Sequence, residues 1–143
     1  MNYEKYKPHF IVLTEAGFIA VNQGDEDSAV KLFKAAALIA PEQSLPKIGF
    51  GYIHLCKLEL KQAAKVFSEI LEADPENEMA KTFLGLSLSL NPTELSKGEE
   101  ILADTDQTAK DPMIKDLASS ALKFVSRFVK KASSPVEVSS NKS

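Results

Sequence analysis

The sequence predicts an all-α protein, built as a row of about three helix–turn–helix pairs and closed by a C-terminal helix. Three observations support this prediction. The chain matches itself at an offset of about 34 residues, apolar side chains recur at helical spacing, and a proline follows the expected second helix of the first two units. A unit of this length has room for two helices and two short turns, so successive units are expected to stack as a solenoid.

Glycine and phenylalanine recur at the same places in successive units. Gly17, Gly51 and Gly85 are equally spaced along the chain, and Phe33 precedes Phe67 by the same interval. Two further pairs share this offset, Ala29 with Ala63 and Pro41 with Pro75. A glycine inside a helix costs roughly 1 kcal/mol relative to alanine, so these glycines are expected where a neighbouring helix approaches closely. The phenylalanines are expected to fill the layer between pairs.

The third unit departs from this pattern in its second half. The three repeats are placed at about 10–43, 44–77 and 78–111. Lys97 occupies the position of the small residue, with Gly98 beside it, and Pro112 arrives three residues late. The second helix of this repeat, around Leu95–Ala103, is therefore expected to be short or shifted.

A capping helix is predicted at about 112–131, and it ends the helical domain of residues 1–131. Asp111 and Pro112 are typical of an N-cap and a first helical residue. The apolar side chains that follow form one helical stripe: Ile114, Leu117, Ala118, Ala121, Leu122, Val125, Phe128 and Val129. Residues 132–143 hold five serines and no periodic pattern, so a disordered tail is expected there.

The charge balance argues against a nucleic-acid partner. The chain has 17 basic and 20 acidic side chains, with 44% hydrophobic and 26% charged residues. These values are typical of a soluble globular protein, whereas nucleic-acid binding favours a basic surface. Residues 1–112 carry 11 basic and 18 acidic groups, while residues 113–143 carry 6 basic and 2 acidic groups. The basic C-terminal helix either lies beside an acidic body or forms a dock for an acidic partner.

A cytoplasmic location is expected. The single cysteine, Cys56, excludes an internal disulfide, fits a reducing compartment, and is interpreted as a small buried apolar residue. The first ten residues contain no unbroken apolar stretch, so a signal peptide is not expected. No run approaches the length of about 18 apolar residues that a membrane span needs, so no membrane insertion is expected.

No catalytic, cofactor-binding or metal site is predicted. The chain lacks the GxxxxGK[ST], HExxH and GxSxG motifs and has no paired CxxC. The run Gly-Phe-Gly at 49–51 lacks the third glycine and the preceding strand of a dinucleotide-binding loop. His54 is interpreted as a core histidine. The acidic run at 25–27 is interpreted as a helix start, where carboxylates suit the helix dipole. An enzyme is therefore the least favoured class.

The period and the Gly, Ala, Phe and Pro positions resemble the tetratricopeptide repeat. This resemblance implies a concave groove lined by the first helix of each pair. The expected apolar groove residues, and hence the predicted partner-binding residues, are Ile11, Phe18, Val21, Leu45, Ile48, Tyr52, Leu55, Met79 and Leu86. The same reasoning places Thr14, Thr82 and Ser89 along the groove. Lysine, arginine and asparagine are absent from all of these positions, which disfavours capture of a terminal carboxylate and favours an amphipathic helix.

Among tetratricopeptide proteins, the chain resembles the chaperones of bacterial type III secretion. The segment AKTFLGLSLSLNPTELSKGEEILAD and the short length are most similar to the needle-subunit chaperone (YscG-like) family. That resemblance implies a needle subunit as partner, with its amphipathic helix in the groove, and a second small helical co-chaperone at the first repeat. A partner-free chain is expected to self-associate. Two alternatives are a translocator chaperone of the same system and a general tetratricopeptide interaction scaffold. The C-terminal helix could also fold into the groove and fill it.

Overall fold

The computed structural model describes residues 2–130, and within them it contains seven α-helices and no strand. They are α1 (Phe10–Asn22), α2 (Glu26–Ile39), α3 (Leu45–Cys56), α4 (Leu60–Ala73), α5 (Glu78–Ser89), α6 (Leu95–Thr108) and α7 (Pro112–Phe124). A 3₁₀ helix, Glu4–His9, precedes α1, and α7 runs on into a π-helical turn, Val125–Val129. The prediction of an all-α fold is confirmed for this part of the chain. The expected tail at 132–143 lies outside the described residues.

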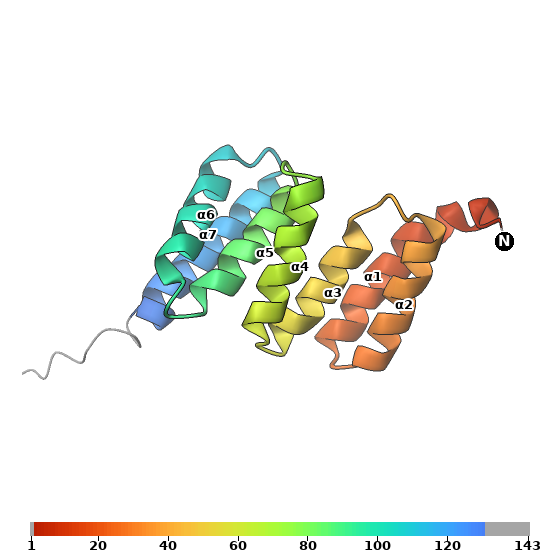
Figure 1. The fold of residues 1–143 in the computed structure, drawn as a ribbon, viewed down its shortest axis with the longest axis horizontal. Coiled ribbons are helices and arrows are strands. Elements are labelled where there is room, and N and C mark those ends of the chain that lie inside the picture. The colour runs from red at the N-terminus through yellow and green to blue at the C-terminus, as the bar shows by residue number, and fades with distance from the viewer. Residues whose placement is uncertain (1, 131–143) are drawn as a thin grey trace, which may run out of the picture.

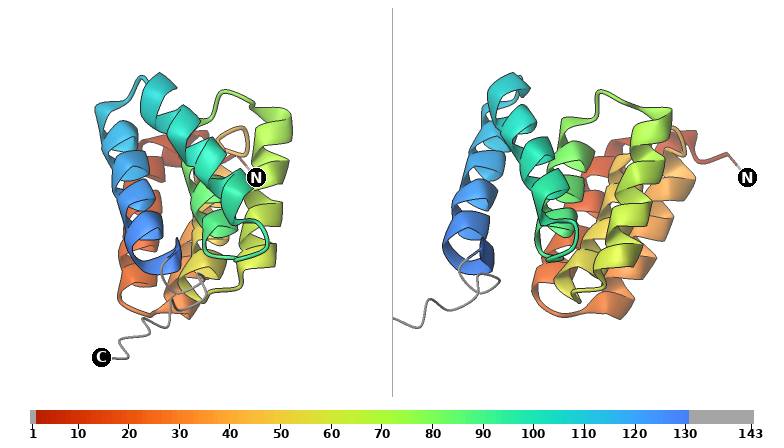
Figure 2. Two further views of the ribbon diagram at one scale, coloured as in Figure 1. Left: turned by 90° about the vertical axis from the view of Figure 1, so that its left-hand side faces the viewer. Right: turned by 60° about the vertical axis from the view of Figure 1, so that its left-hand side comes forward.

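The helices pack in chain order, as in a helical repeat. Each helix contacts the next one along the chain, and the odd-numbered helices also contact each other in sequence. Figure 1 shows the pairs as a row that runs from α1 and α2 at one end to α6 and α7 at the other. In the end-on view of Figure 2, α1 and α7 lie towards one side and α4 towards the other. The odd-numbered helices therefore form one layer of the molecule.

Two of the three recurring glycines, Gly17 and Gly51, lie where a phenylalanine ring of the second helix packs against the first. A Cβ atom built on Gly17 would stand 2.5 Å from the ring of Phe33, and one on Gly51 would stand 2.6 Å from the ring of Phe67. Both phenylalanines are fully buried. The expected close approach of helices at these glycines is confirmed. The favourable packing of a buried ring outweighs the cost of glycine inside a helix.

The second helix of the third pair is shifted and not short. The start of α4 follows the start of α2 by the same interval that separates the recurring glycines. The start of α6 follows the start of α4 by one residue more than that interval. All three helices have 14 residues. The small residue against Ser89 and Gly85 is accordingly Gly98, and Leu102 packs over Gly85. One extra residue before α6 thus explains why Lys97 occupies the small-residue position in the sequence alignment.

Helix α7 closes the row of helices. Its inner face buries Ile114, Ala118 and Ala121, and the π-helical turn that follows buries Val125. Asp111 caps its first turn by accepting a hydrogen bond from the Met113 amide at 2.9 Å, as predicted. In the part of the chain that the structure describes, no helix has the length and apolarity needed to cross a bilayer.

The turn between α3 and α4 holds a leucine in a left-handed conformation. Leu58 has φ 58°, and it occupies the repeat position of Gly24, which has φ 76°. The left-handed region costs an L-residue roughly 1–2 kcal/mol, and Leu58 is 69% exposed, so it gains little from burial. We expect Leu58→Gly to stabilise the protein by about 1 kcal/mol, measured by urea unfolding. Leu58→Ala, which keeps the strain, should give no such gain.

Candidate protein-binding groove

An apolar hollow of about 440 Å³ lies across the layer of odd-numbered helices. Its walls come from α1, α3, α5 and α7 and from none of the even-numbered helices. The lining residues are Phe18, Asn22, Tyr52, Leu55, Met79, Phe83, Leu86 and Leu117. We call this surface the groove. None of its lining side chains carries a charge at neutral pH, so it is suited to an apolar ligand surface.

The repeat builds the groove by placing equivalent residues side by side. Phe18, Tyr52 and Leu86 hold one repeat position on α1, α3 and α5, and all three are half-buried and line the groove. The residues one helical turn earlier point into the core and are 2% exposed or less: Thr14, Ile48 and Thr82. One turn of helix therefore separates the groove face from the core face of each of these helices.

Aromatic rings connect the groove with the core beneath it. The ring centroid of Tyr52 lies 5.6 Å from that of Phe18 and 5.5 Å from that of Phe83. Phe83 in turn stacks on the buried ring of Phe67, at 5.5 Å. Such contacts contribute beyond the area that they bury, so the groove floor is rigidly supported.

The polar contact within the groove is made by a tyrosine. The Tyr52 hydroxyl donates a hydrogen bond of 2.7 Å to Oδ1 of Asn22. Burial, with the neighbouring Cys56 thiol, raises the pKa of Tyr52 to about 12. The phenol therefore stays neutral at physiological pH and adds no charge to the groove.

Five of the nine predicted partner-binding residues line the groove: Phe18, Tyr52, Leu55, Met79 and Leu86. Ile11 is 55% exposed near the start of α1 and stands at the repeat position of Leu45 and Met79. Val21 lines a smaller hollow of about 170 Å³ beside Ile53 and Cys56, and Leu45 packs half-buried against the core. Ile48 is 2% exposed and belongs to the core, so a partner could not contact it without moving the helices.

Three residues of the groove lining are not among the predicted partner-binding residues: Asn22, Phe83 and Leu117. Phe83 and Leu117 share one repeat position, but that position in the first two pairs holds Glu15 and Gly49. Because this position is not apolar in the first two pairs, the repeat pattern did not predict Phe83 and Leu117 as groove residues. The spacing of one helical turn between Met79 and Phe83 was the available signal, because it places both on one helix face.

Helix α7 leaves most of the groove open. It packs against α5 and α6 as a further helix of the row and contributes Leu117 to the groove wall. In the structure, α7 therefore does not fill the groove, in contrast to the alternative in which the C-terminal helix folds into it.

A charged cluster ties the first pair to the second outside the groove. Lys57 Nζ lies 3.3 Å from an oxygen of Glu26 and 3.1 Å from one of Glu59, and His54 Nδ1 lies 3.5 Å from Glu59. The hydrogen bond with Glu59 raises the pKa of Lys57 and lowers that of Glu59. His54 is half-exposed and Cys56 is exposed, so the interpretation of both as buried residues was wrong.

The acidic run at 25–27 has structural partners, as interpreted from the sequence. Asp25 caps α2 by accepting a hydrogen bond of 3.1 Å from the Ser28 amide. Hydrogen bonding with Ser28, through its side chain and its amide, lowers the pKa of Asp25. Glu26 pairs with Lys57. Among residues 2–130, no group of three or more His, Cys, Asp or Glu side chains is placed to hold a metal ion.

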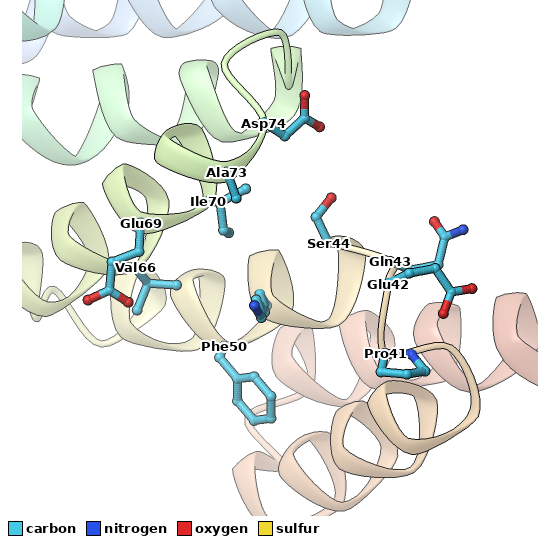
Figure 3. A pocket seen from close by; sticks show the side chains of 11 residues that line it. Pro41, Glu42, Gln43, Ser44, Phe50, Val66, Glu69, Ile70, Ala73 and Asp74 are labelled. Carbon is cyan, nitrogen blue, oxygen red and sulfur yellow. The ribbon is translucent and has the colours of Figure 1, made fainter.

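A second hollow, of about 550 Å³, lies between the α2–α3 loop and α4 (Figure 3). Val66 and Ile70 form part of an apolar wall, while the carboxylates of Glu42, Glu69 and Asp74 lie at separate edges of the pocket. General acid–base chemistry needs titratable groups that converge on one reacting position, and these carboxylates do not converge. The groove is therefore the stronger candidate site.

Comparison with protein families, with curated proteins and with solved structures finds no match to this chain.

Proposed function

We propose that this protein is a tetratricopeptide-like solenoid that acts as a cytoplasmic type III secretion chaperone. It binds an amphipathic helix of the needle subunit in the groove and prevents premature polymerisation; it is not an enzyme and uses no cofactor. The observation that carries this proposal is the uncharged groove, in which equivalent residues of three successive odd-numbered helices line one hollow. Covering the apolar face of a subunit helix would remove the surface through which such subunits assemble.

The chemistry of the groove favours a helix over a peptide terminus. A terminal carboxylate needs several cationic or amide donors, and the lining has no lysine or arginine and a single amide side chain, that of Asn22. An apolar helix face needs only shape and apolar area, which Phe18, Met79 and Leu86 supply. The groove is also open along the row, so a rod can lie across several helices.

The outer face of α1 supports a second helical partner. Val12 is 63% exposed and Ile19 is 56% exposed. The residues at the same repeat positions on α3, α5 and α7 are all buried. They are Pro46, Ala80 and Ile114 at the position of Val12, and Ile53, Ser87 and Ala121 at the position of Ile19. The first pair thus lacks the preceding helix that covers this face in every later pair. A small helical co-chaperone would cover it, and without one the chain is expected to self-associate.

A charge in the groove tests the proposal. We expect Tyr52→Glu to weaken capture of a co-expressed needle-sized helical subunit about 100-fold, because a buried unpaired carboxylate costs roughly 3 kcal/mol. Titration calorimetry of the purified pair measures this change. Leu38→Glu on α2 is the matched control, since Leu38 is apolar and 58% exposed outside the groove, and it should bind normally.

Three outcomes would contradict the proposal. Normal capture by a folded Tyr52→Glu variant, checked by circular dichroism, would exclude the groove, and Phe18→Glu repeats the test on α1. A partner segment that stays extended when bound would favour a translocator chaperone. A partner unrelated to secretion would favour a general interaction scaffold.

A further inference from the structure

Helix α7 and the turn that follows it carry an apolar stripe that continues the groove wall towards the C-terminal end. The stripe consists of four side chains on one helix face, because each follows the one before it by one or two helical turns. They are Met113, Leu117, Phe124 and Phe128. Leu117 lines the groove, while Phe124 is 46% exposed, Phe128 is 57% exposed and Met113 is 79% exposed. At the rise of an α-helix the stripe is about 22 Å long. Among residues 2–130 it is therefore a partly exposed apolar surface next to the groove.

Cationic side chains flank the aromatic half of this stripe. The rings of Phe124 and Phe128 lie 5.1 Å apart, and the Arg127 guanidinium stands 5.9 Å from the centroid of Phe128. Lys123 precedes Phe124 on the adjacent face, and within residues 2–130 neither Lys123 nor Arg127 makes an ion pair. Asp116 is the only carboxylate on α7, and it lies two turns away, near the other end of the helix.

One carboxylate stands at the opposite end of the groove. Glu15 is exposed on α1, at the repeat position that Phe83 and Leu117 occupy in the groove lining. Since both of those residues face the groove, Glu15 stands at its α1 border. The uncharged groove thus has a carboxylate beside its first helix, and two cations beside the stripe that extends from its last helix.

We infer that the groove orients its ligand by charge. The ligand is an amphipathic helix whose apolar stripe is flanked by carboxylates at one end, and that end lies against Phe124 and Phe128, within reach of Lys123 and Arg127. Amines at the other end of the ligand helix lie near Glu15. Four packed helices at the usual interaxial distances give a span of about 25–30 Å, which a helix of about 20 residues covers. This inference rests on the proposed function, because it needs a helix in the groove.

Two synthetic helical peptides of this length test the orientation. Both have the same leucine stripe; one carries glutamates in its N-terminal half and lysines in its C-terminal half, and the other has the halves exchanged. A nitroxide label at the glutamate end should broaden the NMR amide signals of α7 for both peptides, and a label at the lysine end should broaden those of α1. A third peptide, with glutamine in place of all charges, should bind without a preferred direction.

Charge reversal gives the matched comparison. Lys123→Glu with Arg127→Glu should weaken binding of the charged peptides about tenfold at low salt and remove the preferred direction, and added salt should shrink the difference. Lys31→Glu with Lys34→Glu, both exposed on α2, changes the net charge equally and should have no such effect. Binding that is lost with Tyr52→Glu but shows no preferred direction would overturn this inference and leave the proposed function standing. Absence of binding by all three peptides would overturn both.

Discussion

Phe67→Ala is expected to destabilise the protein by about 4 kcal/mol, a large share of the total stability of a domain of this size. The Phe67 side chain is 0% exposed, and its ring occupies the space that the missing side chain of Gly51 leaves. Because the backbone of α3 is already close, it cannot collapse fully into the cavity, so the loss includes a cavity term as well as lost apolar burial. Urea unfolding followed by circular dichroism measures the change.

The same substitution should also weaken the groove. Phe67 stacks on Phe83 at 5.5 Å, and Phe83 lines the groove, so the truncation removes the support of a groove side chain. Phe124→Ala is the control for removal of a ring at an exposed site, and it should cost less than about 1 kcal/mol. A Phe67→Ala variant as stable as Phe124→Ala would show that the ring is not the packing centre of the second pair.

A compensating pair gives a sharper test of the contact between Phe67 and Gly51. Gly51→Ala alone should be destabilising, because its new methyl group would meet the Phe67 ring. In a Phe67→Leu background the same alanine should be tolerated, since the smaller side chain leaves room for the methyl group. Equal effects of Gly51→Ala in both backgrounds would contradict the contact.

The sequence was sufficient to predict the helix pairs because a few positions in each pair have strict steric requirements. Only glycine fits beneath the ring of Phe33 or Phe67, and α2 and α4 each end two residues before a proline. These requirements recur at a constant interval, and so they are visible without a structure. The shift in the third pair could not be predicted in the same way. Alignment of the chain with itself places Lys97 at the small-residue position, with Gly98 next to it, and does not show that one residue is inserted in the preceding loop.

The groove was harder to predict, because the core face and the groove face of each odd-numbered helix are both apolar. Ile48 and Tyr52 stand one turn apart on α3, and composition does not distinguish the buried residue from the groove residue. That assignment depends on how the neighbouring pair is rotated, which is a tertiary property. The contribution of Leu117 depends likewise on where α7 packs, which no periodicity within α7 determines.

Gly98→Ala is expected to destabilise the protein by about 3 kcal/mol, even though alanine is the better helix former by roughly 1 kcal/mol. A Cβ atom on Gly98 would overlap the Ser89 amide nitrogen and hydroxyl, and would stand 2.6 Å from the Gly85 carbonyl oxygen. Two of these three atoms belong to the backbone of α5, so a rotamer change cannot relieve the contact. Helices α5 and α6 would have to separate. This movement would also pull the buried side chain of Leu102 away from Gly85.

Substitution of the neighbouring lysine tests the register of α6 against α5. Lys97 is exposed on α6, so Lys97→Ala should change the free energy of unfolding by less than about 0.5 kcal/mol. If α6 instead kept the register of the earlier pairs, position 97 would face α5, in the place of Ala63 in α4. Lys97→Ala would then stabilise the protein and Gly98→Ala would be harmless. Thermal unfolding of the two variants therefore distinguishes the shifted register from the unshifted one, because the two registers predict opposite rankings of stability.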